Sequence, residues 1–192
     1  PIIIISNLNQ AMKFLSIVAT VIVSSVFTTE GFVPQHQALH RASKTRVYAD
    51  VAVEAEVAAG VGATIDVSLG GKFETLSGPP IKTKAYVKSI SDGNETVRGG
   101  TAFNGPFQLG PTVRLVIEAE NTVDVIVISG LCQTYDDSQG RPHGIIIQEY
   151  DVIGVKSGMH FRAFYENFTD KLLIVDVPGT TSRDITLFEH TK

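Results

Sequence analysis

The sequence lacks tryptophan and has a single cysteine, Cys132, among its 192 residues. One cysteine excludes an intramolecular disulfide and any zinc site built from several cysteines. Charged residues are sparse, at 19%, and a formal net charge of −4 gives no reason to expect nucleic acid as a partner. Apolar residues, at 43%, and 17 glycines are typical of one globular domain.

The charge is divided unevenly along the chain. Residues 1–49 contain four basic residues and one acidic residue, whereas residues 50–192 contain 12 basic and 19 acidic residues. The first segment is therefore cationic and the second anionic. This contrast predicts two segments with different roles.

The cationic segment is similar to a bipartite plastid-targeting presequence of algae with complex plastids. Met12 and Lys13 precede an apolar run over residues 14–27. That run has the length of a signal-peptide core and is shorter than the roughly 20 residues that a membrane-spanning helix needs. Cleavage is expected before Phe32, and residues 32–49 contain no acidic residue, as in transit peptides.

We therefore divide the chain into an upstream extension (1–11), a signal-peptide-like segment (12–31), a transit-peptide-like segment (32–50) and a folded domain (51–192). The predicted location is the plastid, with no stable membrane span after processing. The alternatives are a plain secretory signal with a propeptide, which would place the protein outside the cell or in the endomembrane lumen, and a retained anchor.

The folded domain is predicted to be α/β or α+β, a single compact unit with a mixed sheet and one or two packed helices. Alternating apolar residues predict strands at 65–69, 84–90, 112–118 and 123–129, and the last two are expected to form a hairpin. A continuous apolar run predicts a strand at 171–177, and a short helix is expected within 51–61. A second helix is expected to begin at Ser157, with an apolar stripe of Phe161, Phe164, Tyr165 and Phe168.

Several sequence blocks occur in an order that resembles the C-terminal domain of the MlrC family, the microcystin-degrading metallopeptidases and their relatives, over residues 51–185. The blocks are Gly60–Ala63 with Leu69–Lys72, Val123–Ser129 with Gln133 and Asp136, Val155–Ser157 with His160–Ala163, and Val175–Gly179. The chain departs from the family at Leu131 and Cys132, where basic residues are usual, and at Ile146, where an acid is usual.

The resemblance implies that zinc belongs to an N-terminal domain for which this chain has no room. His143, His160 and His190 are widely spaced, and no pair has the spacing of zinc ligands. We therefore assign no catalytic residue and no metal ligand to this chain. Zinc is expected only in a missing N-terminal domain.

Several residues are candidates for a ligand-facing or interdomain surface. The densest cluster is formed by Lys156, Ser157 and His160. Lysine, histidine and a helix N-terminus are groups that suit an anion. Arg162 belongs to the same cluster but is expected to point away from His160 and to pair with Glu166. A capped helix with a surface ion pair is the structural alternative.

Further candidates lie outside that cluster. Gly70 and Gly71 precede Lys72 without the spacing of a phosphate-binding loop, and a simple glycine turn is the alternative. Asp136 is added from the family resemblance. Asp136, Asp137, Cys132 and His143 include the residue types of a nucleophile and its base, but their spacing fixes no geometry, and structural roles are expected.

Three functions remain open at this point. The chain is the C-terminal domain of an MlrC-like metallopeptidase, inactive alone and packed on a zinc domain. Alternatively, it is a stand-alone module that binds a small anion or a peptide. The third alternative is a hydrolase in its own right or the truncated form of a complete zinc peptidase. Whether the chain is an enzyme is left open.

Overall fold

The computed structural model describes residues 2–6, 45–50, 54–69, 79–99, 104–118, 122–130, 132–175 and 186. Gly70, Gly71 and Lys72, as well as His190, lie outside these ranges. The strands are β1 (Ile2–Ser6), β2 (Thr45–Asp50), β3 (Thr64–Leu69), β4 (Ile81–Ser91), β5 (Asn94–Val97), β6 (Gly105–Gln108), β7 (Thr112–Glu118), β8 (Thr122–Ile128), β9 (Val152–Lys156) and β10 (Leu172–Val175). The helices are α2 (Glu54–Ala59), α3 (Arg162–Tyr165) and the 3₁₀ turns η1 (Asp137–Gln139), η2 (Arg141–His143) and η3 (Ile147–Glu149).

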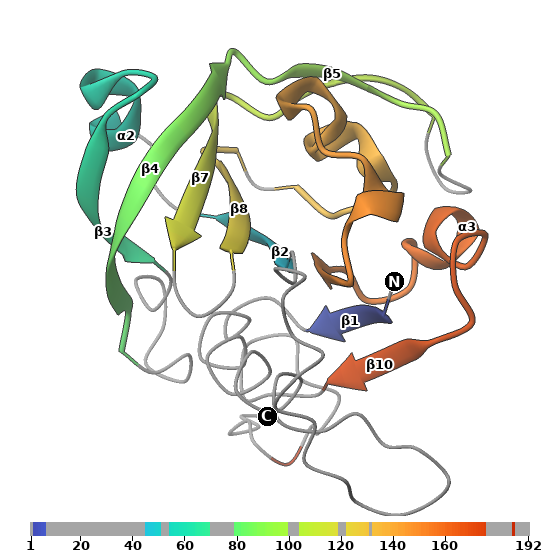
Figure 1. Ribbon diagram of the computed structural model, residues 1–192. Helices are drawn as coiled ribbons and strands as arrows, with labels where there is room; N and C mark the ends of the chain where they lie inside the picture. The colour runs from blue at the N-terminus through green and yellow to red at the C-terminus, as the bar shows by residue number, and fades with distance from the viewer. Residues whose placement is uncertain are drawn as a thin grey trace, which may run out of the picture.

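Eight of these strands form one mixed sheet in the order β10-β1-β9-β2-β8-β7-β4-β3 (Figure 1). Neighbours from β10 to β8 run parallel, whereas β8, β7, β4 and β3 form an antiparallel meander. Strands β5 and β6 make a separate hairpin. The prediction of a single compact α+β domain with a mixed sheet and few helices is confirmed.

Strands β1 and β2 fall within the segments that sequence analysis assigns to the upstream extension and the transit peptide. In the structure β1 pairs with β9 and β10, and β2 pairs with β8 and β9. The sheet therefore includes residues that we expect to precede the domain. The division of the chain, and the removal of its leader, stay predictions.

The hairpin expected from the alternating sequence is formed by β7 and β8. Thr112 lies opposite Ile128 and Glu118 lies opposite Thr122, which leaves a short connection between the strands. Residues Val123 to Ile128 are all buried, because β8 lies in the interior of the sheet and is covered on both faces. The strand that carries the strongest apolar signal is therefore at the centre of the molecule.

Two apolar cores lie on opposite faces of the sheet. The first joins alternate residues of β3, β4, β7 and β8, among them Leu69, Val87 and Leu115, which are fully buried. The second joins Ile126 and Ile128 of β8 to β9, to the segment with the 3₁₀ turns and to α3. Figure 1 shows these turns and α3 together on one side of the sheet.

The start predicted for the second helix is wrong. Strand β9 extends to Lys156, and α3 begins only at Arg162, without a side-chain cap at Phe161. Ser157 cannot cap it because its side chain lies at the end of β9 and bonds to Gln133. The apolar stripe is correct, since Phe161 and Tyr165 are fully buried in the second core and Phe164 and Phe168 pack against it.

The β5–β6 hairpin is a feature that the sequence did not predict. Gly105 pairs with Val97 and Pro106 pairs with Thr96, two residue types that are depleted in strands. The hairpin has strands of four residues each, so alternation gives little signal.

Within the part of the chain that the structure describes, no helix combines the length and apolarity that crossing a bilayer requires.

Candidate functional site

The predicted cluster around Lys156 lies at the carboxyl end of β9, inside the parallel half of the sheet. Lys156 and Ser157 are 7% and 4% exposed. The segment that follows β8 runs beside them, since the Thr134 amide donates to the Lys156 carbonyl and Gln133 Nε2 donates to Ser157 Oγ at 3.1 Å. Carboxyl ends of parallel strands are where open sheets commonly bind ligands.

His160, in the loop after β9, also contacts the segment that follows β8. Its ring stacks on Tyr135 with centroids 5.5 Å apart and an interplanar angle of 16°. Its Nδ1 is buried and has no hydrogen-bond partner among the described residues. Gly158, between Ser157 and His160, is exposed, and a side chain placed there would meet no atom within 4 Å. The loop after β9 is therefore open to solvent beside a buried polar atom.

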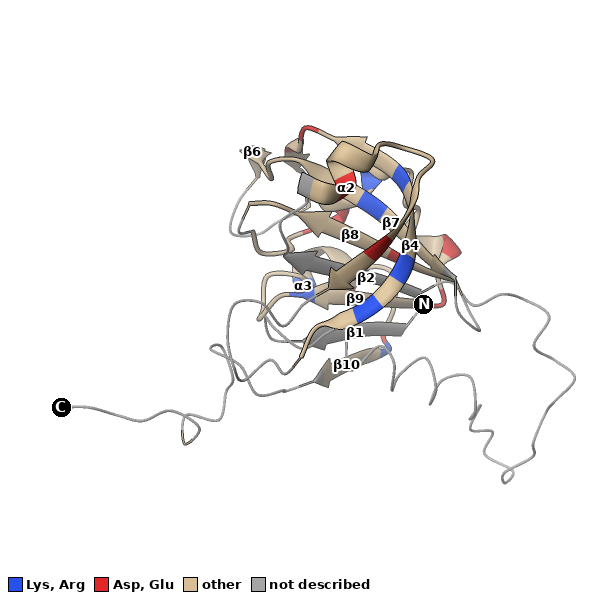
Figure 2. Ribbon diagram, turned by 90° about the vertical axis from the view of Figure 1, so that its left-hand side faces the viewer, with Lys and Arg blue, Asp and Glu red and all other residues tan. Residues whose placement is uncertain are grey.

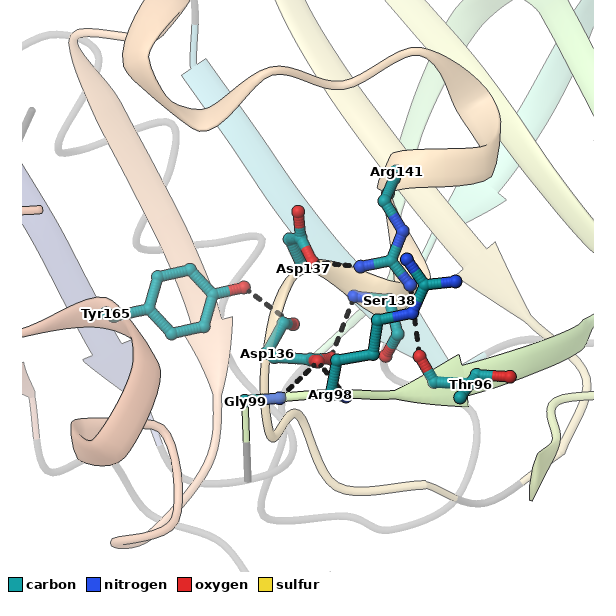
Figure 3. A network of polar contacts seen from close by, with 8 residues as sticks. All are labelled: Thr96, Arg98, Gly99, Asp136, Asp137, Ser138, Arg141 and Tyr165. Carbon is teal, nitrogen blue, oxygen red and sulfur yellow. Dashed lines mark hydrogen bonds and ion pairs between the residues drawn. The ribbon is translucent and has the colours of Figure 1, made fainter. Parts of the chain in front are cut away.

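Asp136 follows Tyr135 and joins several backbone segments through hydrogen bonds (Figure 3). Its side chain is fully buried, with Oδ2 accepting from the amides of Arg98 at 2.7 Å and Gly99 at 3.1 Å and Oδ1 accepting from the Ser138 amide at 2.9 Å. The Tyr165 hydroxyl donates to the Asp136 carbonyl at 3.0 Å. The residue thus ties the end of β5 and α3 to the segment beside β9.

The bonds of Asp136 also set its ionisation. Burial alone would raise the pKa of the carboxyl, but the backbone amides of Arg98, Ser138 and Gly99 outweigh it, so the pKa is lowered from 3.8. Three donors that bond the charged form stabilise it relative to the neutral acid. Asp136 is therefore a buried carboxylate whose two oxygens accept hydrogen bonds from backbone amides.

A second ionic link supports the same corner. Arg141 pairs with Asp137 and donates from Nη2 to the Thr96 carbonyl at 3.0 Å (Figure 3). Arg162, by contrast, is exposed and pairs with Glu166, as predicted. The structure therefore gathers Asp136, Lys156, Ser157 and His160 on two adjoining segments and directs Arg162 outward. Their roles toward a ligand stay predictions.

The structure also buries His143 between two serines, a contact that the sequence did not predict. His143 is 5% exposed, and its ring lies between two serines of β4, with Ser89 Oγ at 2.6 Å from Nδ1 and Ser91 Oγ at 3.2 Å from Nε2. The Cys132 thiol donates to the Gln133 carbonyl. The expectation of structural roles for Cys132, Asp136, Asp137 and His143 stays a prediction.

A buried ion pair lies next to that histidine. Arg114 Nε donates to Asp124 Oδ1 at 2.7 Å, Nη1 donates to the His143 carbonyl at 2.8 Å, and the Tyr150 hydroxyl donates to Asp124 Oδ2 at 2.8 Å. Burial alone would lower the pKa of Arg114, but the bond to Asp124 outweighs it and the pKa is raised. The available signal was a charged residue inside each of two alternating apolar segments, Arg114 in β7 and Asp124 in β8.

Zinc does not fit the residues that the structure describes. Within those ranges, no group of three or more His, Cys, Asp or Glu side chains lies close enough to share a metal ion. We therefore derive no metal chemistry from them. What the carboxyl end of β9 offers is an ammonium, a hydroxyl and an imidazole, groups that donate hydrogen bonds to a carboxylate or a carbonyl oxygen.

The architecture is shared with a solved protein. A candidate metallopeptidase from Mesorhizobium sp. BNC1 superimposes with a TM-score of 0.70 at 18% sequence identity. The match covers 94% of this chain and 34% of that protein, so the chain spans about a third of its length. No curated protein matches the chain.

The family model of the MlrC C-terminus matches residues 34–192, which is most of the sequence. That range includes β2 and every later element of the sheet. The blocks quoted from the sequence, including Lys156–Ser157 and His160, lie within it. The chain therefore belongs to the MlrC family, of which it carries the C-terminal domain.

Proposed function

We propose that this domain has no peptidase activity alone and completes the active site of an MlrC-type metallopeptidase by packing beside a zinc-binding domain. The observation that carries the proposal is the group of Lys156, Ser157 and His160 at the carboxyl end of β9, next to the loop at Gly158. The zinc domain would come from the rest of a longer polypeptide or from a separate partner.

The chemistry of the cluster supports a role in substrate binding. Peptide hydrolysis needs donors that hold the substrate's carbonyl or carboxylate while the metal domain carries out the reaction. Ser157 is held by Gln133 and His160 by its stack on Tyr135, so both groups are fixed before a substrate arrives. We propose a peptide bond as the substrate of the complete enzyme, as in the microcystin-degrading members that the sequence resembles.

A stand-alone binding module is the second candidate. The observation in its favour is His160 Nδ1, which is buried without a hydrogen-bond partner in the described part of the chain. Buried polar atoms of side chains are normally satisfied, and a bound carboxylate or similar small anion would satisfy this one. In that case the same residues bind a ligand without any partner domain.

The deciding experiment is to recover the native protein from its source and measure its intact mass, zinc content and peptidase activity. We expect a species that contains zinc and carries additional sequence or a stable partner, whereas the recombinant 192-residue chain binds no stoichiometric zinc. A lone small species without zinc would favour the binding module. Stoichiometric zinc and peptidase activity in the recombinant chain alone would overturn both proposals.

A variant series locates the site within the native assembly. His160→Ala and Ser157→Ala should each lower kcat/KM by about tenfold or more, because each removes a donor to the reacting group. Lys171→Ala, an exposed change before β10, is the matched control and should leave kcat/KM unchanged. Equal activity in all three variants would exclude the β9 cluster from the active site.

A further inference from the structure

A stripe of lysines (Lys82, Lys84 and Lys88) runs along β4, away from the β9 cluster. Lys82, Lys84, Tyr86 and Lys88 are all exposed, and Figure 2 shows basic positions repeated along this strand. Residues two apart in a strand point to the same face and lie about 6.8 Å apart. Lys82 and Lys84 are therefore one such step apart, Tyr86 follows at the next step, and Lys88 lies at the register shift between Val87 and Ser89.

The stripe is incompletely neutralised. Lys84 Nζ pairs with Asp66 Oδ1 of β3 at 3.0 Å, and both side chains are largely exposed. Neither Lys82 nor Lys88 has an ion-pair partner among the residues that the structure describes. Two cations thus flank a weakly held pair, in a segment of the chain in which acidic residues outnumber basic ones.

The surface also has a shape and an apolar component. A groove of about 490 Å³ runs over β3 and β4 and is lined by Asp66, Val67, Ser68, Lys82, Thr83 and Lys84. Tyr86 is 37% exposed and lies between Lys84 and Lys88. Tyrosine is enriched on surfaces that bind protein segments, because its ring adds contact area at little entropic cost.

We propose that this face of β4 is a docking surface for an acidic, extended segment of a partner protein. An extended peptide with Asp or Glu two positions apart has the spacing of Lys82 and Lys84, and a further carboxylate beyond Tyr86 would meet Lys88. A nucleic acid fits less well, because the negative balance of residues 50–192 repels a long polyanion more strongly than a short acidic segment.

The test is fluorescence anisotropy of the full chain with a labelled decapeptide that has glutamate at alternate positions and serine between them. We expect saturable binding that weakens with salt. Lys82→Gln and Lys88→Gln should each weaken binding about threefold, and the double variant about tenfold. Asp66→Asn should strengthen binding about twofold, because it frees Lys84 and removes a repelling charge.

Lys171→Gln is the matched control, since it removes an exposed lysine outside the stripe and should leave binding unchanged. All four positions are exposed, so the variants should keep the circular dichroism spectrum of the parent. The proposal is overturned if the parent does not bind the peptide or if the control weakens binding as much as Lys82→Gln. It is also overturned if a single-stranded oligonucleotide or an anionic phosphatidylserine vesicle binds the stripe more tightly than the peptide.

Discussion

Asp136 shows how a single side chain can hold several segments in place. Its carboxylate accepts from Arg98, Gly99 and Ser138, and its carbonyl accepts from Tyr165. The sequence separations to Arg98 and Gly99 are 38 and 37 residues. No local pattern could predict these bonds, because a backbone amide is the same donor in every residue type. The family resemblance pointed to Asp136, but only the structure shows its bonds.

Asp136→Asn should lower the free energy of unfolding at neutral pH by about 2–3 kcal/mol, because the amide loses the charge that strengthens three buried hydrogen bonds. Urea unfolding followed by circular dichroism measures this change. Asp170→Asn, at an exposed position, is the control and should change stability by less than about 0.5 kcal/mol. A cost for Asp136→Asn as small as for the control would contradict the role of the carboxylate.

The same residue predicts a pH dependence. Because the pKa of Asp136 is lowered in the folded chain, its stabilising contribution is present above the unfolded value near 3.8 and is lost as the pH falls through the folded value. The stability difference between the parent and Asp136→Asn should therefore shrink below about pH 4. A difference that stays constant down to acid unfolding would show that Asp136 does not titrate as inferred.

At the level of elements, the turn between β4 and β5 depends on Gly93. Its φ is +73°, and a Cβ there would lie 1.9 Å from the Gly110 carbonyl oxygen, a backbone atom that cannot move aside. Gly60 has a similar φ of +82° but no atom within 4 Å of an added Cβ. Alanine substitutions at the two glycines therefore distinguish the free-energy cost of a left-handed backbone from the cost of a steric clash.

Gly60→Ala should cost about 1 kcal/mol of stability, since alanine tolerates the left-handed region poorly. Gly93→Ala should cost at least about 3 kcal/mol, because the turn and the strand behind it must also shift. Thermal and urea unfolding of both variants measure the difference. Equal costs would mean that the turn relaxes freely and that the close approach of the two backbones contributes nothing.

The adjacent strands β7 and β8 are joined by the pair Arg114 and Asp124. Asp124→Ala should cost about 3–5 kcal/mol, because it leaves the guanidinium buried without its counter-charge. Tyr150→Phe keeps the pair and removes one hydroxyl bond, so it should cost about 1 kcal/mol. Urea unfolding of the two single variants and the double variant gives the coupling between them. A cost for Asp124→Ala no larger than for Tyr150→Phe would exclude a buried charge.

The elements that the sequence predicted are those whose side chains alternate against one core. Strands β3, β4, β7 and β8 were found because they each place every second residue in the first core. The β5–β6 hairpin was missed because Gly105 and Pro106 carry no strand signal. The helix after β9 was predicted too long, because an apolar stripe records burial of Phe161 and Tyr165 but not where the chain leaves the strand.

At the scale of the whole molecule, the sheet includes N-terminal residues that removal of the predicted leader would take away. Strand β1 pairs with both β9 and β10, so the sheet as described uses residues 2–6. Cleavage before Phe32 would remove that strand and leave β2, which lies inside the family match over residues 34–192, in place. The mature fold therefore differs between the two cases by one strand of the parallel half.

We expect the native protein to begin at Phe32 or beyond and a fluorescent-protein fusion of residues 12–50 to enter the plastid. Phe32→Ala should hold the fusion outside the plastid in the endomembrane system, because the residue at the predicted cleavage point is lost. Mass spectrometry of the native N-terminus and microscopy of the two fusions measure both results. A native chain that retains residues 2–6 would show that β1 is a permanent part of the sheet and that the leader interpretation is wrong.

A native chain that starts near Phe32 would leave the edges of β9 and β10 to pair with each other or with the partner domain. Amide hydrogen exchange in β9 and β10 of the processed protein, alone and in its native assembly, then distinguishes these two arrangements.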